Sequence, residues 1–156
     1  MDISKYINLI YAVVVWVAVF ILIKPGRIKR LLPLGILSAL ILFGVELYFM
    51  SLMMHKYNNP LLPIAGIPLF HLIWGAGSGI IFFNYLKKGF SKKLLVIFFF
   101  TILTQVFFYI ANKVGSHTGL NGFNDMYHFI LNFFTLSILA FFGEGLFGRN
   151  IYPDAK

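Results

Sequence analysis

The sequence predicts an all-α membrane protein, and two observations support this class. Five apolar segments each approach the length of about 20 residues that a helix needs to cross a bilayer. Hydrophobic residues make up 60% of the 156-residue chain, and no loop is long enough to fold separately. The predicted architecture is one bundle of five transmembrane helices in a single domain, residues 1–156, with spans at about 7–23, 31–54, 61–86, 94–111 and 126–147.

The placement of the basic residues predicts the orientation. In a soluble protein, a formal net charge of +8 would suggest a nucleic-acid partner. Here ten basic residues fall on one side of the predicted membrane: Lys24, Arg27, Lys29, Arg30, Lys87, Lys88, Lys92, Lys93, Arg149 and Lys156. Three fall on the other side: Lys5, Lys56 and Lys113. Because short loops rich in Lys and Arg stay in the cytoplasm, we expect the N-terminus outside and the C-terminus inside the cell membrane. The expected surroundings are lipid, with no nucleic acid.

The first two spans are joined by a basic hairpin. Lys24-Pro25-Gly26-Arg27 follows the first span, where a secreted protein would have a small-residue cleavage site. The first span is therefore expected to stay attached. Pro and Gly end a helix and permit a sharp reversal, after which the second span runs to Met54 and carries Glu46.

The third span begins irregularly. Pro63 and Pro68 remove backbone donors and are expected to bend the segment or delay regular helix until about Pro68. Gly75 and Gly79 follow at the spacing that lets another helix approach closely. We therefore expect this to be the central helix of the bundle.

The fourth and fifth spans flank residues 112–125, a polar loop with three glycines. It is the only loop with room to form a lid or a binding surface; a flexible connector is the alternative. Asp125 is predicted to cap the fifth helix, since a carboxylate there satisfies free backbone donors. His55 and His117 fall in outer loops and are expected to be solvated.

Five polar residues in the outer half of the predicted membrane form the candidate binding site. A helix rises about 1.5 Å per residue, which places Glu46 roughly 12 Å and His71 roughly 15 Å below the outer ends of their spans. On the same scale Gln105 and Asn132 lie at about 9 Å and His128 at roughly 3 Å. Because an ionisable group at this depth costs roughly 3 kcal/mol, a shared polar pocket that opens outward is the simplest explanation.

This pocket has two interpretations. In the functional one, Glu46 accepts a proton or a cation, His71 is its hydrogen-bond partner or relay, and His128 lies at the mouth. Gln105 and Asn132 would then orient a ligand or water. In the packing interpretation, Glu46 pairs with His71 or with a tyrosine only to hold the helices in register.

The sequence predicts no metal site, no cofactor and no catalytic residue. Glu46, His71 and His128 supply the residue types of a two-histidine, one-carboxylate metal site, but no close-spaced motif fixes their geometry, and His128 is expected to be too shallow. The chain has no cysteine, which excludes thiolate chemistry. No nucleophile–base pair or phosphate motif occurs at a recognisable spacing, which disfavours an enzyme.

A diffuse pattern along most of the chain resembles uncharacterised small five-span membrane proteins of Gram-positive, spore-forming bacteria. The pattern consists of the basic hairpin, Leu32-Pro33, an acidic residue in span two, then Pro63, Gly66 and Pro68, then Asn84-Tyr85 followed by lysines, and a glycine-rich outer loop. The resemblance implies five helices and a plasma membrane, and it carries no activity or site residues to transfer.

Two functions are consistent with the sequence. The first is a small transport or ligand-binding component that uses the pocket around Glu46 and His71. Five helices do not divide into paired inverted halves, so a symmetric pathway would need a homodimer. The alternative is a non-catalytic interaction subunit that joins a membrane partner through the Gly75/Gly79 face. Polar residues become sparse beyond the outer half, which favours a pocket or an interface over an open channel.

Overall fold

The computed structural model describes residues 3–152, without the side chains of residues 149 and 150, and it is predominantly helical. Lys156 and the side chain of Arg149, both counted in the charge pattern, therefore lie outside the described residues. The elements in chain order are α1 (Ile3–Leu22), α2 (Pro25–Ser51), β1 (His55–Tyr57), β2 (Pro63–Ile64), β3 (Ile67–Pro68), α3 (Leu69–Tyr85), α4 (Phe90–Lys113), β4 (His117–Gly119), α5 (Asp125–Phe147) and the 3₁₀ turn η1 (Gly148–Ile151).

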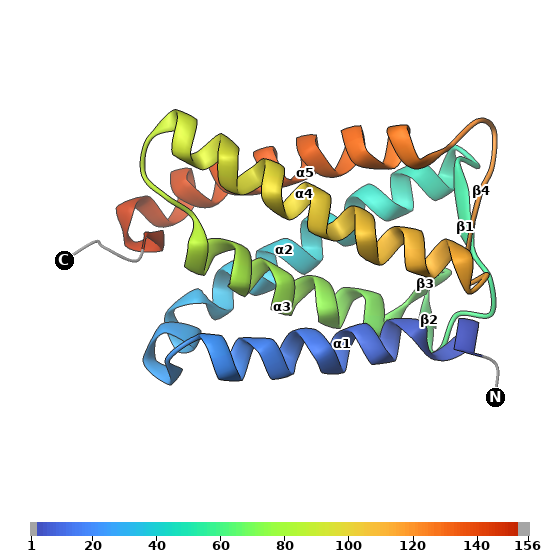
Figure 1. The fold of residues 1–156 in the computed structure, drawn as a ribbon, viewed down its shortest axis with the longest axis horizontal. Helices are drawn as coiled ribbons and strands as arrows, with labels where there is room; N and C mark the ends of the chain where they lie inside the picture. The colour runs from blue at the N-terminus through green and yellow to red at the C-terminus, as the bar shows by residue number, and fades with distance from the viewer. Residues whose placement is uncertain (1–2, 153–156) are drawn as a thin grey trace.

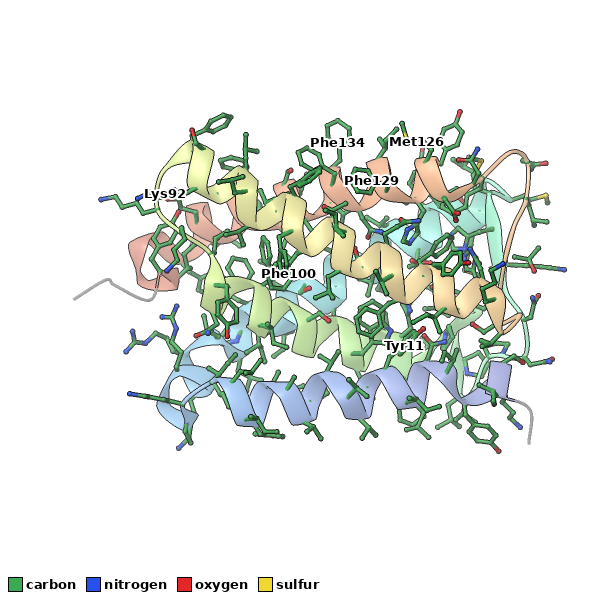
Figure 2. All side chains as sticks on the ribbon, in the orientation of Figure 1. Tyr11, Lys92, Phe100, Met126, Phe129 and Phe134 are labelled. Atoms are coloured by element: carbon green, nitrogen blue, oxygen red, sulfur yellow. The ribbon has the colours of Figure 1, made fainter. Side chains whose placement is uncertain are left out.

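The chain reverses direction between successive helices, so its loops gather at two ends (Figure 1). We call one the basic end; it holds the α1–α2 turn, the α3–α4 loop and η1. The other, the strand end, holds all four short strands and the start of α1 (Figure 1). Lys92 extends from the basic end (Figure 2). The loops that the sequence predicts on one side of the membrane therefore lie together at one end of the structure.

Within residues 3–152, four helices are long and apolar enough to cross a membrane: α1, α2, α4 and α5. Large apolar side chains remain exposed on their outer faces, for example Ile21, which is 76% exposed, and Phe134, which is 60% exposed. Phe134 projects away from the other helices (Figure 2). Water would oppose such faces, whereas lipid accommodates them. The predicted all-α class is confirmed, and the four apolar helices indicate a membrane-spanning protein.

The third predicted span is shorter as a helix than expected. The helix α3 has 17 residues, and the residues before it form the hairpin β2–β3. Ala65 and Gly66 connect the two strands with φ values of 50° and 85°, which is the pattern of a tight type I′ turn. Regular helix begins only after Pro68, as the two prolines predict.

Close packing between α2 and α3 explains the glycines of α3. A Cβ atom on Gly79 would lie 2.4 Å from Cβ of Ser38, and one on Gly75 would lie 2.5 Å from a methyl group of Leu42. Ser38 also donates a hydrogen bond of 3.1 Å to the carbonyl oxygen of Gly75. The expected close helix approach is therefore made within the chain. The Gly75/Gly79 face is covered by α2, so the interaction-subunit alternative loses the surface it was based on.

An apolar core fills the basic end. Its largest fully buried members include Leu31, Leu34, Ile80, Phe82, Phe83 and Ile97. Lys93, a residue only 4% exposed, forms an ion pair with Glu144 at this end. Arg27 donates to the carbonyl oxygens of Ile151 and Tyr152, which fastens η1 to the start of α2. The end opposite the strands is thus closed by packed side chains.

Candidate ligand pocket

Two loops at the strand end pair to form a cap over it. The strands β1 and β4 are antiparallel, with Lys56 opposite Thr118 and Tyr57 opposite His117. Asn58 adds a side-chain hydrogen bond of 2.7 Å to the hydroxyl group of Thr118. The 112–125 loop, for which the sequence left a lid and a flexible connector open, is therefore ordered through β4 and held against the α2–α3 loop. We call this pair of strands the cap.

A cavity of about 70 Å³ lies beneath the cap. By the volume that one water molecule needs, it has room for on the order of five waters or a small ligand. All five helices contribute to its walls. Its apolar lining is mostly aromatic: Tyr11, Trp74, Phe107, Phe108 and Phe123. Its polar lining includes Asn8, Glu46, His55, Tyr57, Ser116, His71, His117, His128 and Asn132.

Glu46 is the centre of a hydrogen-bonded network in this lining. Its Oε2 atom lies 2.9 Å from the hydroxyl group of Tyr57 and 3.3 Å from Nε2 of His55. Its Oε1 atom lies 3.5 Å from Nε2 of His71, as the similar estimated depths of the two residues predict. The Tyr57 hydroxyl is also 3.1 Å from the same nitrogen of His71. The carboxylate of α2 is thus joined to both α3 and the cap.

The contact at Nδ1 of His71, on the side of the ring away from Glu46, determines the tautomer of this histidine. The indole N–H of Trp74 can only donate, and it faces Oδ1 of Asn8 at 3.4 Å. The same oxygen lies 3.3 Å from Nδ1 of His71. Because Trp74 donates to this atom, the atom is the amide oxygen, which can only accept hydrogen bonds. Its contact with His71 therefore needs a hydrogen on Nδ1 of His71. Asn8, on α1, therefore sets the protonation of a ring nitrogen on α3.

Counting hydrogens across the network shows that it holds one extra proton. Nε2 of His71, the hydroxyl of Tyr57 and the carboxylate of Glu46 form two consecutive short contacts. Each contact needs one hydrogen, and Tyr57 supplies only one. The second hydrogen comes from a protonated Nε2 of His71 beside an ionised Glu46, or from a protonated Glu46 beside a neutral His71. The two arrangements differ only in the position of one proton, which Glu46 and His71 share in this geometry.

The cap histidines are buried, which corrects the expectation that they are solvated. His55 is 4% exposed and His117 is 8% exposed; their rings stack with centroids 4.8 Å apart. Burial lowers the pKa of His55, against the opposing charge of Glu46. Burial, with a smaller contribution from His55, lowers the pKa of His117 to about 4. Both rings are therefore neutral near pH 7, because strand pairing pulls them out of water.

Neutral His55 offers a free acceptor. Since its Nε2 atom faces the Glu46 carboxylate, the ring hydrogen belongs on Nε2, and Nδ1 keeps its lone pair. Among the described residues, His55 Nδ1 and the hydroxyl oxygen of Ser116 are buried without a hydrogen-bond partner. Burying such atoms costs free energy unless something else binds them. Both belong to residues that line the cavity.

A second polar group lies on the opposite wall. Nδ1 of His128 is 2.8 Å from Oε1 of Gln105, and the Asn132 amide nitrogen is 3.0 Å from both ring nitrogens. The ring of Phe108 stacks on His128 with centroids 3.5 Å apart. His128 and Asn132 line the cavity, while Gln105 holds His128 from behind. His128 therefore reaches the same cavity as Glu46 and His71, although its estimated depth placed it closer to the surface.

The structure thus brings the five candidate residues to one region, in two groups. Sequence reasoning missed five further polar members of the site: Asn8, His55, Tyr57, Ser116 and His117. Asn8 carried a usable signal, because it is a polar residue inside an apolar span. Tyr57 lies near a span end in the sequence, where tyrosines of the membrane interface are typical, so its position alone did not indicate a site residue. A separate correction concerns α5, whose N-cap is Asn124, accepting from the backbone nitrogens of Met126 and Tyr127. Asp125 is the first helical residue.

Within residues 3–152, no three His, Asp or Glu side chains are arranged to hold a metal ion. Comparison with known proteins gives no match to a protein-family model, to a curated protein or to a solved structure. Function is therefore inferred from the residues of this chain alone.

Proposed function

We propose that the chain is a five-span membrane protein whose outward-facing pocket, around Glu46 and His71, binds a small polar ligand at a site that also binds a proton. The orientation has the strand end outside and the basic end in the cytoplasm. The ten-to-three distribution of basic residues supports it. In this arrangement α3, the third helix in chain order, also crosses the membrane and brings the number of spans to five. The β2–β3 hairpin completes its outer end.

The observation that carries the proposal is the combination of the cavity with the Glu46–Tyr57–His71 network. An ionisable group that only ties helices together needs no space beside it. Here the network borders a cavity whose lining also includes His55 and Ser116, each of which has a buried acceptor without a hydrogen-bond partner. Since polar groups at membrane depth are costly and concentrate at functional sites, a binding role accounts for both features. A packing role accounts only for the network.

The closed basic end favours ligand binding over an open channel. The cavity is lined from the strand-end halves of the helices, and the basic-end halves are filled by the apolar core around Phe82, Phe83 and Ile97. Passage through the membrane would therefore require a rearrangement or a second copy of the chain. The proposed role is therefore that of a ligand-binding component. Transport would follow only if such a rearrangement opened the pocket toward the basic end.

Cysteine accessibility tests this proposal, because the chain has no cysteine of its own. Thr104 and Val106 lie two residues apart on α4; Thr104 lines the cavity, whereas Val106 is 51% exposed on the apolar outer face. In intact cells, an impermeant thiol reagent should label Thr104→Cys and leave Val106→Cys unlabelled, since lipid excludes the reagent. Ser51→Cys and Ser91→Cys report the orientation, with labelling expected only at position 51.

Protection of Thr104→Cys from the outer side would overturn the outward-facing pocket. Labelling at position 91 in intact cells would overturn the orientation independently of the pocket.

A further inference from the structure

The charge of the cavity selects the sign of its ligand. Glu46 is the only carboxylate among the lining residues, and no lysine or arginine lines the cavity in the described part of the chain. An anion would have no lysine or arginine of the described lining to pair with, and once the proton shared by Glu46 and His71 has left it would meet a carboxylate, which is unfavourable at low dielectric. A cation would meet the carboxylate directly.

The hydrogen-bonding groups select the type of cation. If His71 gives up the extra proton of the network, its Nε2 atom becomes an acceptor beside the Glu46 carboxylate. His55 Nδ1 and the Ser116 hydroxyl oxygen are already unpaired acceptors. The cavity then holds an excess of acceptors over donors. A primary ammonium group carries three N–H donors and no acceptor, which complements this excess.

The aromatic walls fit the rest of such a ligand. Tyr11 meets the rings of Trp74 and Phe107 edge-on, with centroids 6.2 Å and 4.7 Å away. Aromatic faces attract ammonium ions through their quadrupoles, and indole is the strongest of them. The same rings can pack against a short alkyl group. The volume of about 70 Å³ limits the ligand to a small amine.

Inorganic cations fit less well. Sodium and other hard ions are held mainly by several oxygen atoms, whereas this site offers one carboxylate and imidazole nitrogens. Transition metals accept imidazole, but no group of three suitable side chains is arranged around one point in residues 3–152.

We propose that the cavity binds a small primary ammonium ion in exchange for the proton shared by Glu46 and His71. This inference rests on the proposed function, since it assigns a ligand to the same pocket. One positive charge enters and one proton leaves for the outer water, so the charge of the site is unchanged. The other titratable groups around the cavity are Tyr11, His55, Tyr57, His117 and His128.

Calorimetric titration of the purified full-length protein with methylammonium chloride tests the exchange. Repeating it in buffers of different ionisation enthalpy counts the protons released. We expect one proton released per ion bound, and an apparent affinity that falls about tenfold per pH unit toward acid, because protons compete for the site. Tetramethylammonium, which has no N–H donor, should bind at least about tenfold more weakly, since each lost hydrogen bond to a charged group weakens binding by that order.

Variants locate the exchanged proton. Glu46→Gln should lower methylammonium affinity by about a hundredfold or more, because the charge pairing is lost. His71→Gln should bind without releasing a proton. Tyr127→Phe, at an exposed tyrosine that does not line the cavity, is the control and should keep both the affinity and the proton release. Binding without proton release in the unmodified protein, equal binding of tetramethylammonium, or binding of Zn²⁺ in place of methylammonium would overturn the inference.

The two proposals fail separately. If Thr104→Cys is labelled from outside but methylammonium does not bind, the ammonium inference is wrong and the outward pocket stands. If Thr104→Cys is protected from outside, the pocket itself is wrong.

Discussion

The hydroxyl group of Tyr57 donates a hydrogen bond of 2.9 Å to Oε2 of Glu46. This bond joins the first strand of the cap to the second helix. The same hydroxyl lies 3.1 Å from Nε2 of His71 on α3, so Tyr57 bridges the Glu46 carboxylate and the His71 imidazole. Cap, helix and proton site are therefore coupled through one side chain.

Tyr57→Phe should destabilise the protein by about 1–3 kcal/mol, because it leaves a buried carboxylate oxygen short of a donor. The measurement is thermal unfolding in detergent. Tyr127→Phe, at a tyrosine that is 55% exposed, is the control and should be nearly silent. In a double-mutant cycle with Glu46→Leu, which removes the acceptor, additive effects would show that the Tyr57–Glu46 bond contributes nothing.

Two substitutions of Glu46 separate function from packing. Glu46→Gln should fold normally, since the amide can still accept from Tyr57 and can donate to a neutral His71. It should lose ligand binding or proton-coupled flux, because the amide carries no charge and cannot exchange a proton. Glu46→Leu should lower stability by about 1–3 kcal/mol for each buried group left unpaired. Detergent stability is measured beside flux or binding in vesicles. A Gln variant with normal binding and flux would leave Glu46 with a packing role alone.

The close contact between α2 and α3 gives a steric prediction. Gly79→Ala should destabilise by about 1–3 kcal/mol, because its Cβ would lie 2.4 Å from Cβ of Ser38 and the helices must move apart. Gly44→Ala is the matched control on α2, where an added Cβ meets nothing within 4 Å. Alanine there should be neutral or slightly stabilising. Equal thermal unfolding temperatures for the two variants would contradict the observed packing.

Helical rise and hydropathy are sufficient to predict much of this fold. Because a helix has a fixed rise per residue, the position of a residue in an apolar span gives its depth in the membrane. This rule alone predicts similar depths for Glu46 and His71, which lie 3.5 Å apart in the structure. Pro68 ends the irregular start of α3 for a local reason, the missing backbone donor. Such features depend on neighbours in the sequence.

The cap depends on partners distant in the sequence. Its strands have three residues each and pair segments about 60 positions apart, such as Tyr57 with His117. Three residues are too few to show the alternation that marks a strand, so both histidines resembled solvated loop residues. Tyr57 likewise fitted the aromatic belt that membrane interfaces display. Only tertiary pairing moves these three side chains into the cavity wall.

The buried cap histidines predict a stability that depends on pH. The pKa of His117 is lowered to about 4 from an ordinary value of 6.5, so the unfolded chain binds its proton first as the pH falls. Stability should therefore be greatest above pH 6.5 and decline between pH 6.5 and about 4, by on the order of 3 kcal/mol for this residue. The lowered pKa of His55 acts in the same direction.

Thermal unfolding across this pH range checks the dependence. His117→Phe should flatten it, because phenylalanine keeps the ring but binds no proton. Asn112→Ala removes the residue whose side-chain oxygen lies 3.1 Å from His117 Nδ1 but keeps the imidazole, so its pH dependence should persist. A steep dependence that survives in His117→Phe would assign it to other groups.

The register of the cap allows it to be closed covalently. Lys56 and Thr118 are direct partners on β1 and β4, and cross-strand neighbours lie within the Cα separation that a disulfide spans. We expect Lys56→Cys/Thr118→Cys to form a disulfide under mild oxidation. Because the bond closes a loop of about 60 residues, it should stabilise the protein by about 2–4 kcal/mol, reversibly with reductant. The corresponding single-cysteine variants are the controls and should not respond to oxidation.

If ligands enter beneath the cap, the oxidised variant should also bind methylammonium more slowly, with little change in the final amount bound. A folded double variant that fails to cross-link would contradict the pairing of the outer loops on which the buried histidines depend.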